Sequence, residues 1–216
     1  ELFRRQSLAT MREMGIEPYP AAEYVVNAHV EEVKANFSDE EKREVSMAGR
    51  LMSRRIMGKA SFAELKDSTG RIQLYISRDE ICPGENKDLY NTVFKKLLDI
   101  GDFIGVKGYV FRTQTGEISI HVSELIVLSK ALRPLPIVKT DKDGNVHDAF
   151  EDPELRFRQR YVDLVVNEGV KDIFVKRNKV YTSMREYFNS NGYMEVETPV
   201  LQSIPGGASA RPFITH

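Results

Sequence analysis

The sequence contains little cysteine, few histidines and no long hydrophobic run, and each shortage excludes a class of protein. Its one cysteine, Cys82, permits no intramolecular disulfide and fits a reducing compartment, so we expect a cytoplasmic protein. The four histidines are scattered at positions 29, 121, 147 and 216, so they provide no ligand set for zinc. The longest apolar runs, such as residues 125–128, are far shorter than the roughly 18 residues that a membrane span requires. We therefore expect neither a metal site of this kind nor a membrane partner.

Net charge is also close to zero, with 31 Lys and Arg residues against 32 Asp and Glu residues in a chain of 216. A balanced total does not exclude a nucleic-acid partner, because local charge governs binding. Residues 50–59 contain four basic residues and no acidic residue, and residues 154–185 contain eight basic and four acidic residues. Such runs are more often a solvated face than a binding site, so charge alone leaves the function open.

Hydrophobic periodicity divides the chain into segments of different character. Residues 1–15 and about 27–36 have helical spacing, and from about residue 45 the period changes to two. Two prolines and the turn at residues 141–144 mark a linker after the last predicted strand. The predicted domains are a helical extension at 1–44, a barrel at 45–131, a linker at 132–153 and the start of a second domain at 154–216.

The alternating segments have the order of an OB-type Greek-key barrel. The predicted elements are strands near 45–51, 61–66 and 72–77, a helix at 86–99, and strands near 102–112 and 117–129. Residues 67–70 form a hairpin turn signal between the second and third strands. Three strands, a helix and two strands are typical of an OB fold, although another half-open barrel would give a similar pattern.

The second domain begins with two predicted helices and stops in mid-pattern. Residues 155–166 read as a basic helix, and residues 170–189 as a longer helix that ends at Asn191–Gly192. Residues 193–197 read as a short strand, and the rest is mostly loop. Because no closing element follows, we expect the chain to be a fragment of a longer protein.

Alternation also predicts which side chains of the barrel face solvent. The outward set comprises Arg50, Arg54, Phe62, Gln73, Tyr75, Glu117, Ser119 and His121. Aromatic rings stack under bases, amides and carboxylates bond base edges, and arginines neutralise phosphates, so the set suits single-stranded nucleic acid. The alternative is that the aromatic rings pack against the N-terminal helices while the polar groups are only solvated.

Several segments carry motifs that are more specific than strand alternation. The first group is RRIMGKASF (54–62), GRIQLY (70–75), TGE (115–117), SIH (119–121) and KALRPLP (130–136); the second is RQRYVDL (158–164), GYMEVETP (192–199) and residues 204–216. The first group resembles the anticodon-binding OB domain of class II lysyl-tRNA synthetases, and the second resembles the start of their catalytic domain, including motif 1. The resemblance implies an α+β protein, in which N-terminal helices and an OB barrel precede the beginning of an antiparallel-sheet catalytic domain.

The same resemblance implies a reaction and a set of site residues. The complete enzyme would be a lysine–tRNA ligase that uses ATP to attach lysine to its tRNA, as a homodimer. The implied site residues are Arg54, Phe62, Gln73 and Glu117 for the anticodon, Pro199 for the motif 1 dimer interface, and Gly206, Gly207 and Ala208 for lysine. Phe62 is expected to stack on a base, and the glycines leave room for close backbone approach to the bound amino acid.

Other motifs of that family are missing from this sequence. Its motifs 2 and 3, which serve ATP and Mg²⁺ in the complete enzyme, are not found, and neither is a Walker-type phosphate loop. We therefore expect no catalytic residue, no metal ligand and no bound cofactor in this chain. Three alternatives stay open: a single-stranded nucleic-acid-binding OB protein without aminoacylation, an aspartyl- or asparaginyl-tRNA synthetase, or a structural dimer fragment. The RRIMGKASF and RQRY segments favour the lysine family over the second of these.

Overall fold

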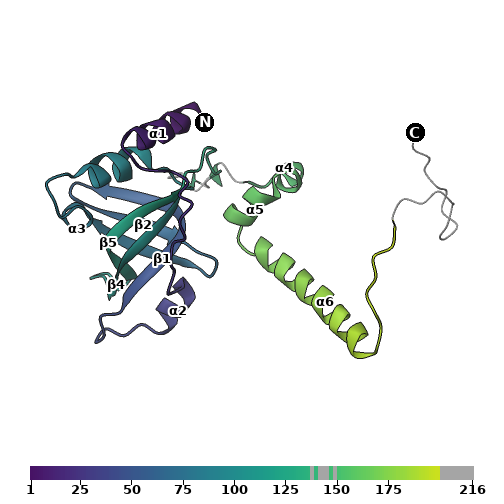
Figure 1. The fold of residues 1–216 in the computed structure, drawn as a ribbon. Helices are drawn as coiled ribbons and strands as arrows, with labels where there is room; N and C mark the ends of the chain where they lie inside the picture. Colours follow the sequence, from purple (N-terminus) through teal and green to yellow (C-terminus); the bar gives the residue numbers. More distant parts are fainter. Residues whose placement is uncertain (137–138, 141–145, 148–149, 200–216) are drawn as a thin grey trace. The chain divides into compact units, whose positions relative to one another are not determined.

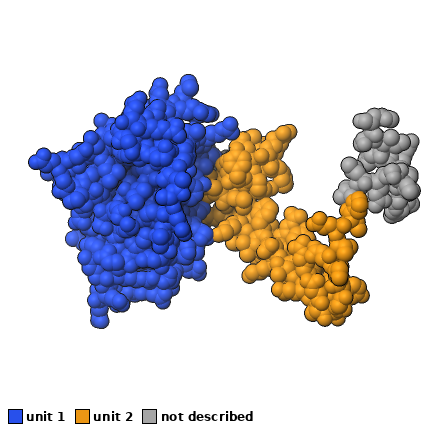
Figure 2. Space-filling model, viewed as in Figure 1, with its two compact units in different colours: residues 1–137 blue, residues 138–216 orange. Residues whose placement is uncertain are grey.

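The chain divides into two compact units between Ile137 and Val138 (Figure 2). The computed structural model describes residues 1–136, 139–140, 146–147 and 150–199. The elements of the first unit are α1 (Leu2–Glu13), α2 (Val30–Ala35), β1 (Glu44–Met57), β2 (Ala60–Lys66), β3 (Arg71–Ser77), α3 (Arg78–Ile81), η1 (Leu89–Leu97), β4 (Phe103–Arg112) and β5 (Ile118–Ser129). This order confirms the predicted succession of two helices, three strands, a helix and two strands, except that the short helix α3 after β3 was not predicted. The finer division of the chain into four domains stays a prediction.

Five strands of the first unit close into a barrel in the order β1-β2-β3-β5-β4 (Figure 1). The pairs β1–β2, β2–β3, β4–β5 and β1–β4 are antiparallel, whereas β3 and β5 run parallel. A parallel neighbour requires a crossover, which the residues between β3 and β4 make possible. The predicted OB barrel is confirmed by this topology.

Alternation along the strands places the apolar residues inside the barrel. The fully buried strand residues include Met47, Leu51, Leu65, Ile72, Leu74, Ile76, Ile104, Val106, Ile120 and Val122. β2 and β3 each alternate strictly between buried and half-buried residues, as their sequences predict. β1 departs from this rule, because its pairing with β2 shifts between Leu51 and Ser53. This β-bulge exchanges the inward and outward parity of the residues that follow it.

Asp67 ties the start of α2 to the turn between β2 and β3. Its carboxylate accepts hydrogen bonds from the backbone N–H groups of Thr69 at 2.7 Å, Gly70 at 2.8 Å and Val30 at 2.9 Å. Burial alone raises the pKa of a carboxyl, but these donors and the Thr69 hydroxyl outweigh it and lower the pKa of Asp67. The predicted hairpin turn is confirmed, and it also positions a helix 37 residues earlier in the chain.

The longer of the two helices between β3 and β4, η1, is a π-helix. It covers Leu89–Leu97, within the helix predicted at 86–99. Its buried residues Tyr90, Val93, Phe94 and Leu97 belong to the same hydrophobic core as the inward strand residues. The Tyr90 hydroxyl lies 2.7 Å from the Ser61 hydroxyl of β2 in a buried hydrogen bond. η1 therefore packs its apolar face against the barrel core.

A buried ionic cluster joins β4 to the end of β5. The Lys130 ammonium, with a fully buried side chain, contacts the carboxylates of Asp99 and Asp102, the latter at 2.9 Å. Asp102 is also fully buried, and this burial raises its pKa despite the hydrogen bonds that it accepts. Arg4 of α1 donates to the carbonyls of Ile100 and Ala131, both at 3.0 Å. The cluster fastens the segment that leaves the barrel to α1 and to the start of β4.

The second unit contains a two-stranded pair and three helices in its described residues. These elements are β6 (Lys139–Thr140), β7 (Val146–His147), α4 (Pro153–Arg158), α5 (Arg160–Val166) and α6 (Val170–Ser190). α6 and its end near Asn191–Gly192 are confirmed, and Gly192 has the positive φ of 82° that suits glycine after a helix.

Two predictions in the second unit are wrong. The single helix predicted at 155–166 is two helices, because Gln159 has a non-helical backbone, with φ −119° and ψ 53°. The strand predicted at 193–197 is irregular, because no other segment among the described residues pairs with it. No helix among the described residues is both long and apolar enough to cross a membrane.

Candidate nucleic-acid interface

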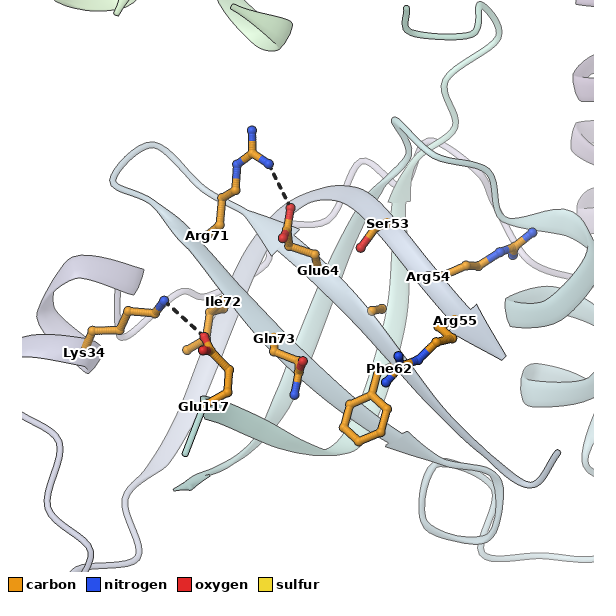
Figure 3. Close-up of a pocket in the computed structure, with 11 residues that line it drawn as sticks. Lys34, Ser53, Arg54, Arg55, Phe62, Glu64, Arg71, Ile72, Gln73 and Glu117 are labelled. Atoms are coloured by element: carbon orange, nitrogen blue, oxygen red, sulfur yellow. Dashed lines mark hydrogen bonds and ion pairs between the residues drawn. The ribbon is translucent and has the colours of Figure 1, made fainter. Parts of the chain in front are cut away.

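The outer face of the barrel has a hollow of about 600 Å³ over β1, β2 and β3 (Figure 3). Its lining residues are Lys34, Ser53, Arg54, Arg55, Phe62, Ala63, Glu64, Arg71, Ile72, Gln73 and Glu117. All four residues predicted to read the anticodon therefore border one hollow, although Glu117 is more than 40 residues away from the others in the chain. We call it the anticodon hollow below, after the role that the resemblance implies for these residues.

Phe62 lies in the middle of β2, with its ring directed outward (Figure 3). The pairing register places Arg55 of β1 on one side and Tyr75 of β3 on the other. The Arg55 guanidinium lies 5.6 Å from the centroid of the Phe62 ring, and the Tyr75 ring centroid lies 5.4 Å away. Phe62 is half-buried, so part of the ring is available to a base while its neighbours fix its orientation.

Gln73 lies beside Phe62 on the same outer face, on the neighbouring strand β3. Its side-chain amide donates a 3.1 Å hydrogen bond to the Ser119 hydroxyl of β5. Ser119 itself is fully buried, so the prediction that it faces solvent is wrong. The reason is that Gln73 and the adjoining strands cover this small side chain. The hydrogen bond holds the Gln73 amide at a fixed place, as an amide that reads a base edge requires.

Both carboxylates of the anticodon hollow are paired with cations. Glu117, in the turn before β5, lies 3.6 Å from the Lys34 ammonium of α2, and Glu64 lies 3.1 Å from the Arg71 guanidinium (Figure 3). All four side chains are at least one-third exposed, so these pairs contribute little to stability. They hold two carboxylates and two cations at the surface of the hollow.

Arg54 borders the hollow, but its side chain points away from it (Figure 3). Its guanidinium donates to the backbone carbonyl of Phe94 in η1, and burial lowers its pKa. The prediction that Arg54 faces outward beside Phe62 is therefore wrong for its guanidinium. The β1 bulge causes the difference, because it places Arg55 opposite Phe62 and Arg54 opposite the buried Ala63.

Four charged residues of the hollow were not predicted as site residues: Lys34, Arg55, Glu64 and Arg71. Glu64 and Arg71 share the outward parity of Phe62 and Gln73, so alternation could have found them. Arg55 was hidden by the bulge, which has no signal in a sequence read alone. Lys34 comes from α2, and only the tertiary contact with Glu117 brings it to this face.

Three other residues that were predicted to face outward, Tyr75, His121 and Arg50, do not line the hollow. Tyr75 faces outward as expected, with its ring half-buried. The His121 side chain is only 15% exposed, and its Nδ1 atom lies 3.3 Å from a Glu80 carboxylate oxygen without forming a hydrogen bond. Arg50 donates a 2.7 Å hydrogen bond to the Gly101 carbonyl and contacts the Phe103 ring, away from the hollow.

The lysine-binding and dimer residues are largely outside this site. Gly206, Gly207 and Ala208 lie outside the described residues. Pro199 is exposed and is the last described residue. Among the described residues, no group of three or more His, Cys, Asp or Glu side chains is placed to hold a metal ion.

Comparison with known families agrees with this geometry. Residues 45–128 match the model of the OB-fold nucleic acid binding domain of the anticodon-binding type, and residues 152–216 match that of tRNA synthetases class II (D, K and N). The chain thus joins an OB-fold domain to the start of a class II synthetase domain, and it belongs to the class II tRNA synthetases.

Curated relatives define the branch of that class. Over its whole length the chain is 69% identical to a lysine–tRNA ligase of Porphyromonas gingivalis strain W83 and 67% identical to one of Azobacteroides pseudotrichonymphae. It is 61% identical to a lysine–tRNA ligase of Christiangramia forsetii. It spans 38%, 43% and 38% of these relatives, respectively, or about two fifths of their length. Over the part that it covers, the sequence is therefore similar to the lysine–tRNA ligases of this class.

Proposed function

We propose that the protein containing this chain is a lysine–tRNA ligase, and that the chain provides its anticodon-binding surface. The observation that carries the proposal is the anticodon hollow itself. It brings Phe62, Gln73 and Glu117 together on an OB barrel whose whole-chain relatives at 61–69% identity are lysine–tRNA ligases. The substrates are lysine, ATP and a lysine tRNA.

Each side chain of the hollow has a distinct task in this proposal. The Phe62 ring stacks on one unpaired anticodon base, which contributes roughly 1–3 kcal/mol. The Gln73 amide and the Glu117 carboxylate bond the edges of neighbouring bases, because unstacked RNA bases expose those edges. Arg55 lies at the rim and neutralises a phosphate. Arg54 acts from behind the face, where it holds η1 to β1 through the Phe94 carbonyl.

The second unit belongs to the aminoacylation half of the enzyme. α6 carries exposed apolar side chains, among them Phe174, Tyr187 and Phe188, which supports a subunit interface on this helix and at Pro199. Gly206, Gly207 and Ala208 lie near the α-ammonium of bound lysine. Mg²⁺ and ATP bind to parts of the enzyme outside the described residues, and the enzyme works in the cytoplasm.

Binding of anticodon stem-loops tests the proposal. We expect the chain to bind a labelled UUU stem-loop more tightly than a GUC stem-loop, at both a low and a physiological salt concentration. Preference for UUU would support reading of bases by Gln73 and Glu117. Equal binding with a steep salt dependence would instead indicate a basic surface without sequence readout, as a general single-strand-binding OB protein has. That outcome would overturn the proposed roles of these two residues.

Catalysis by the chain alone is the second test. We expect no lysine-dependent exchange of pyrophosphate into ATP by the 216-residue chain, because motifs 2 and 3 of the family are not found in its sequence. Measurable exchange that depends on lysine would contradict the proposal that ATP binds to parts of the enzyme outside the described residues.

A further inference from the structure

The segment that follows β5 has no regular secondary structure, yet its backbone is attached to the barrel at several points. It comprises residues 130–136, and we call it the exit segment, because the second unit begins shortly after it at Val138. Irregular surface segments are usually mobile, since few protein contacts restrain them. Here Pro134 and Pro136 restrict two φ angles, and side chains from the N-terminal part of the chain bond the backbone carbonyls. The exit segment therefore has a fixed path.

Arg4 of α1 makes the largest number of these contacts. Its guanidinium donates to three backbone carbonyls, those of Ile100 and Ala131 at 3.0 Å and that of Arg133 at 3.2 Å. The Arg4 side chain is only 12% exposed, and its Nε atom lies 3.8 Å from a carboxylate oxygen of Asp99. Because a guanidinium is a rigid plane, these bonds fix two carbonyls of the exit segment relative to the turn before β4.

The residues after α1 and the turn before β4 add further attachments. The Tyr19 hydroxyl donates a 2.8 Å hydrogen bond to the Lys130 carbonyl, and the Lys130 N–H donates to the Pro18 carbonyl at 3.3 Å. At the other end of the segment, the Leu135 side chain packs over Gly101. A Cβ at position 101 would lie 3.3 Å from the Leu135 Cδ1 atom. Contacts from two parts of the chain thus determine how the exit segment runs.

These contacts are separate from the anticodon hollow, because none of the residues that form them lines it. Their position at the end of the barrel matters for a reaction that needs one tRNA molecule at two places. A tRNA that is bound by its anticodon must also present its acceptor end to the aminoacylation half of the enzyme. The connection between two binding sites sets how often the second is reached, and small errors of position reduce the rate strongly.

We propose that Arg4 is a positioning residue for aminoacylation. Together with Tyr19, it fixes the path by which the chain leaves the barrel, and so restricts where the aminoacylation half meets a tRNA bound to the barrel. This inference rests on the proposed lysine–tRNA ligase function and adds a role for α1, which contacts no substrate in it. Without the Arg4 bonds the exit segment takes several paths, and a smaller share of bound tRNA reaches the aminoacylation half.

Three measurements on the complete protein that contains this chain test the role of Arg4. We expect Arg4→Met to lower kcat/KM for aminoacylation of a whole lysine tRNA by at least about 5-fold, because the acceptor end is misplaced. Lysine-dependent exchange of pyrophosphate into ATP needs no tRNA, so it should stay as in the wild type. Affinity for the isolated UUU stem-loop should also be unchanged, since the hollow is intact.

Two further variants separate positioning from folding. Arg12→Met is the matched control, because Arg12 lies on the same helix and forms only an exposed pair with Glu17 at 3.6 Å. We expect all three measurements to equal those of the wild type. Tyr19→Phe removes a single hydroxyl and should lower aminoacylation alone, by about 3-fold, as the loss of one hydrogen bond gives. Thermal melting checks that each variant is folded.

The outcomes distinguish this role from the proposed function. Wild-type aminoacylation by a folded Arg4→Met protein overturns the positioning role. Equal losses in all three measurements also overturn it, because Arg4 would then serve only the fold. If Arg4→Met does not fold, unchanged aminoacylation by Tyr19→Phe overturns the role instead. Failure of the proposed function is seen in the wild type, which would then show no lysine-dependent exchange or no preference for the UUU stem-loop.

Discussion

Phe62 has a close side-chain neighbour on each adjacent strand, the Arg55 guanidinium and the Tyr75 ring, so a packing role and a binding role are both physically possible for it. We expect Phe62→Ala to weaken binding of the UUU stem-loop by roughly 1–3 kcal/mol, because the stacked base loses its ring. Titration of the labelled stem-loop measures the affinity, and thermal melting measures the stability of the same variant. A variant that melts earlier but binds unchanged when folded would make Phe62 a packing residue.

Glu117 differs from Phe62 because its proposed partner is a base edge rather than a base face. We expect Glu117→Gln to reduce the preference for UUU over GUC more than it reduces total affinity, since edge contacts specify and phosphate contacts position. The loss of the exposed pair with Lys34 changes stability by less than about 1 kcal/mol.

A matched control exists for this substitution. Glu124 is another exposed carboxylate, 2.8 Å from Lys107, away from the anticodon hollow. Glu124→Gln should leave the ratio of the two stem-loop affinities unchanged. An equal loss of affinity for all stem-loops in Glu117→Gln would remove the proposed reading role.

At the scale of secondary-structure elements, Asp67 connects a turn to a helix. We expect Asp67→Asn to lower the free energy of unfolding by about 1–3 kcal/mol near neutral pH, because charge-assisted bonds to three backbone N–H groups are weakened. The pKa of Asp67 is lowered in the folded state. Its contribution is therefore complete above the unfolded-state pKa, about 3.9, and is lost as pH falls through the lower folded-state value.

Unfolding by urea at several pH values measures this effect. The stability difference between the wild type and Asp67→Asn should narrow below about pH 4. Asp39→Asn is the control, because Asp39 forms only an exposed pair with Arg112 at 3.1 Å. A difference that stays constant down to acidic pH would show that the Asp67 charge is not what holds the turn.

The elements themselves were largely predictable, and the exceptions have physical causes. Strand periodicity, the turn at Asp67 and the glycine after α6 are local features, so the sequence contains them. The break at Gln159 was not visible, because apolar spacing continues through it while the backbone leaves the helix. The bulge after Leu51 depends on pairing with β2, so alternation assigned Arg54 to the face that Arg55 occupies.

At the scale of the whole first unit, Lys130 connects the end of the barrel to its beginning. We expect Lys130→Met to lower the free energy of unfolding by about 3–5 kcal/mol, because it leaves the buried Asp102 carboxylate without its cation. The loss should be smaller at acidic pH, where the unpaired carboxyl takes up a proton. Urea denaturation, monitored through the unfolding transition of the barrel, measures both effects.

Lys107→Met is the corresponding control, since Lys107 and Glu124 form an exposed pair on the same sheet. A change below about 1 kcal/mol is expected there. If Lys130→Met lowered the free energy of unfolding by no more than this control, the buried cluster would not be what attaches α1 and the segment after β5 to the barrel.

The ion pairs of the anticodon hollow have a consequence for the small ions around it. RNA binding releases condensed counterions in proportion to the phosphates that protein cations neutralise. Lys34 and Arg71 already lie beside carboxylates, and Arg54 is bonded to a backbone carbonyl, so fewer than the four basic residues of the hollow are free to neutralise RNA phosphates. The logarithm of affinity should then fall with the logarithm of salt with a slope of about −1, instead of the roughly −3 that four unpaired cations would give.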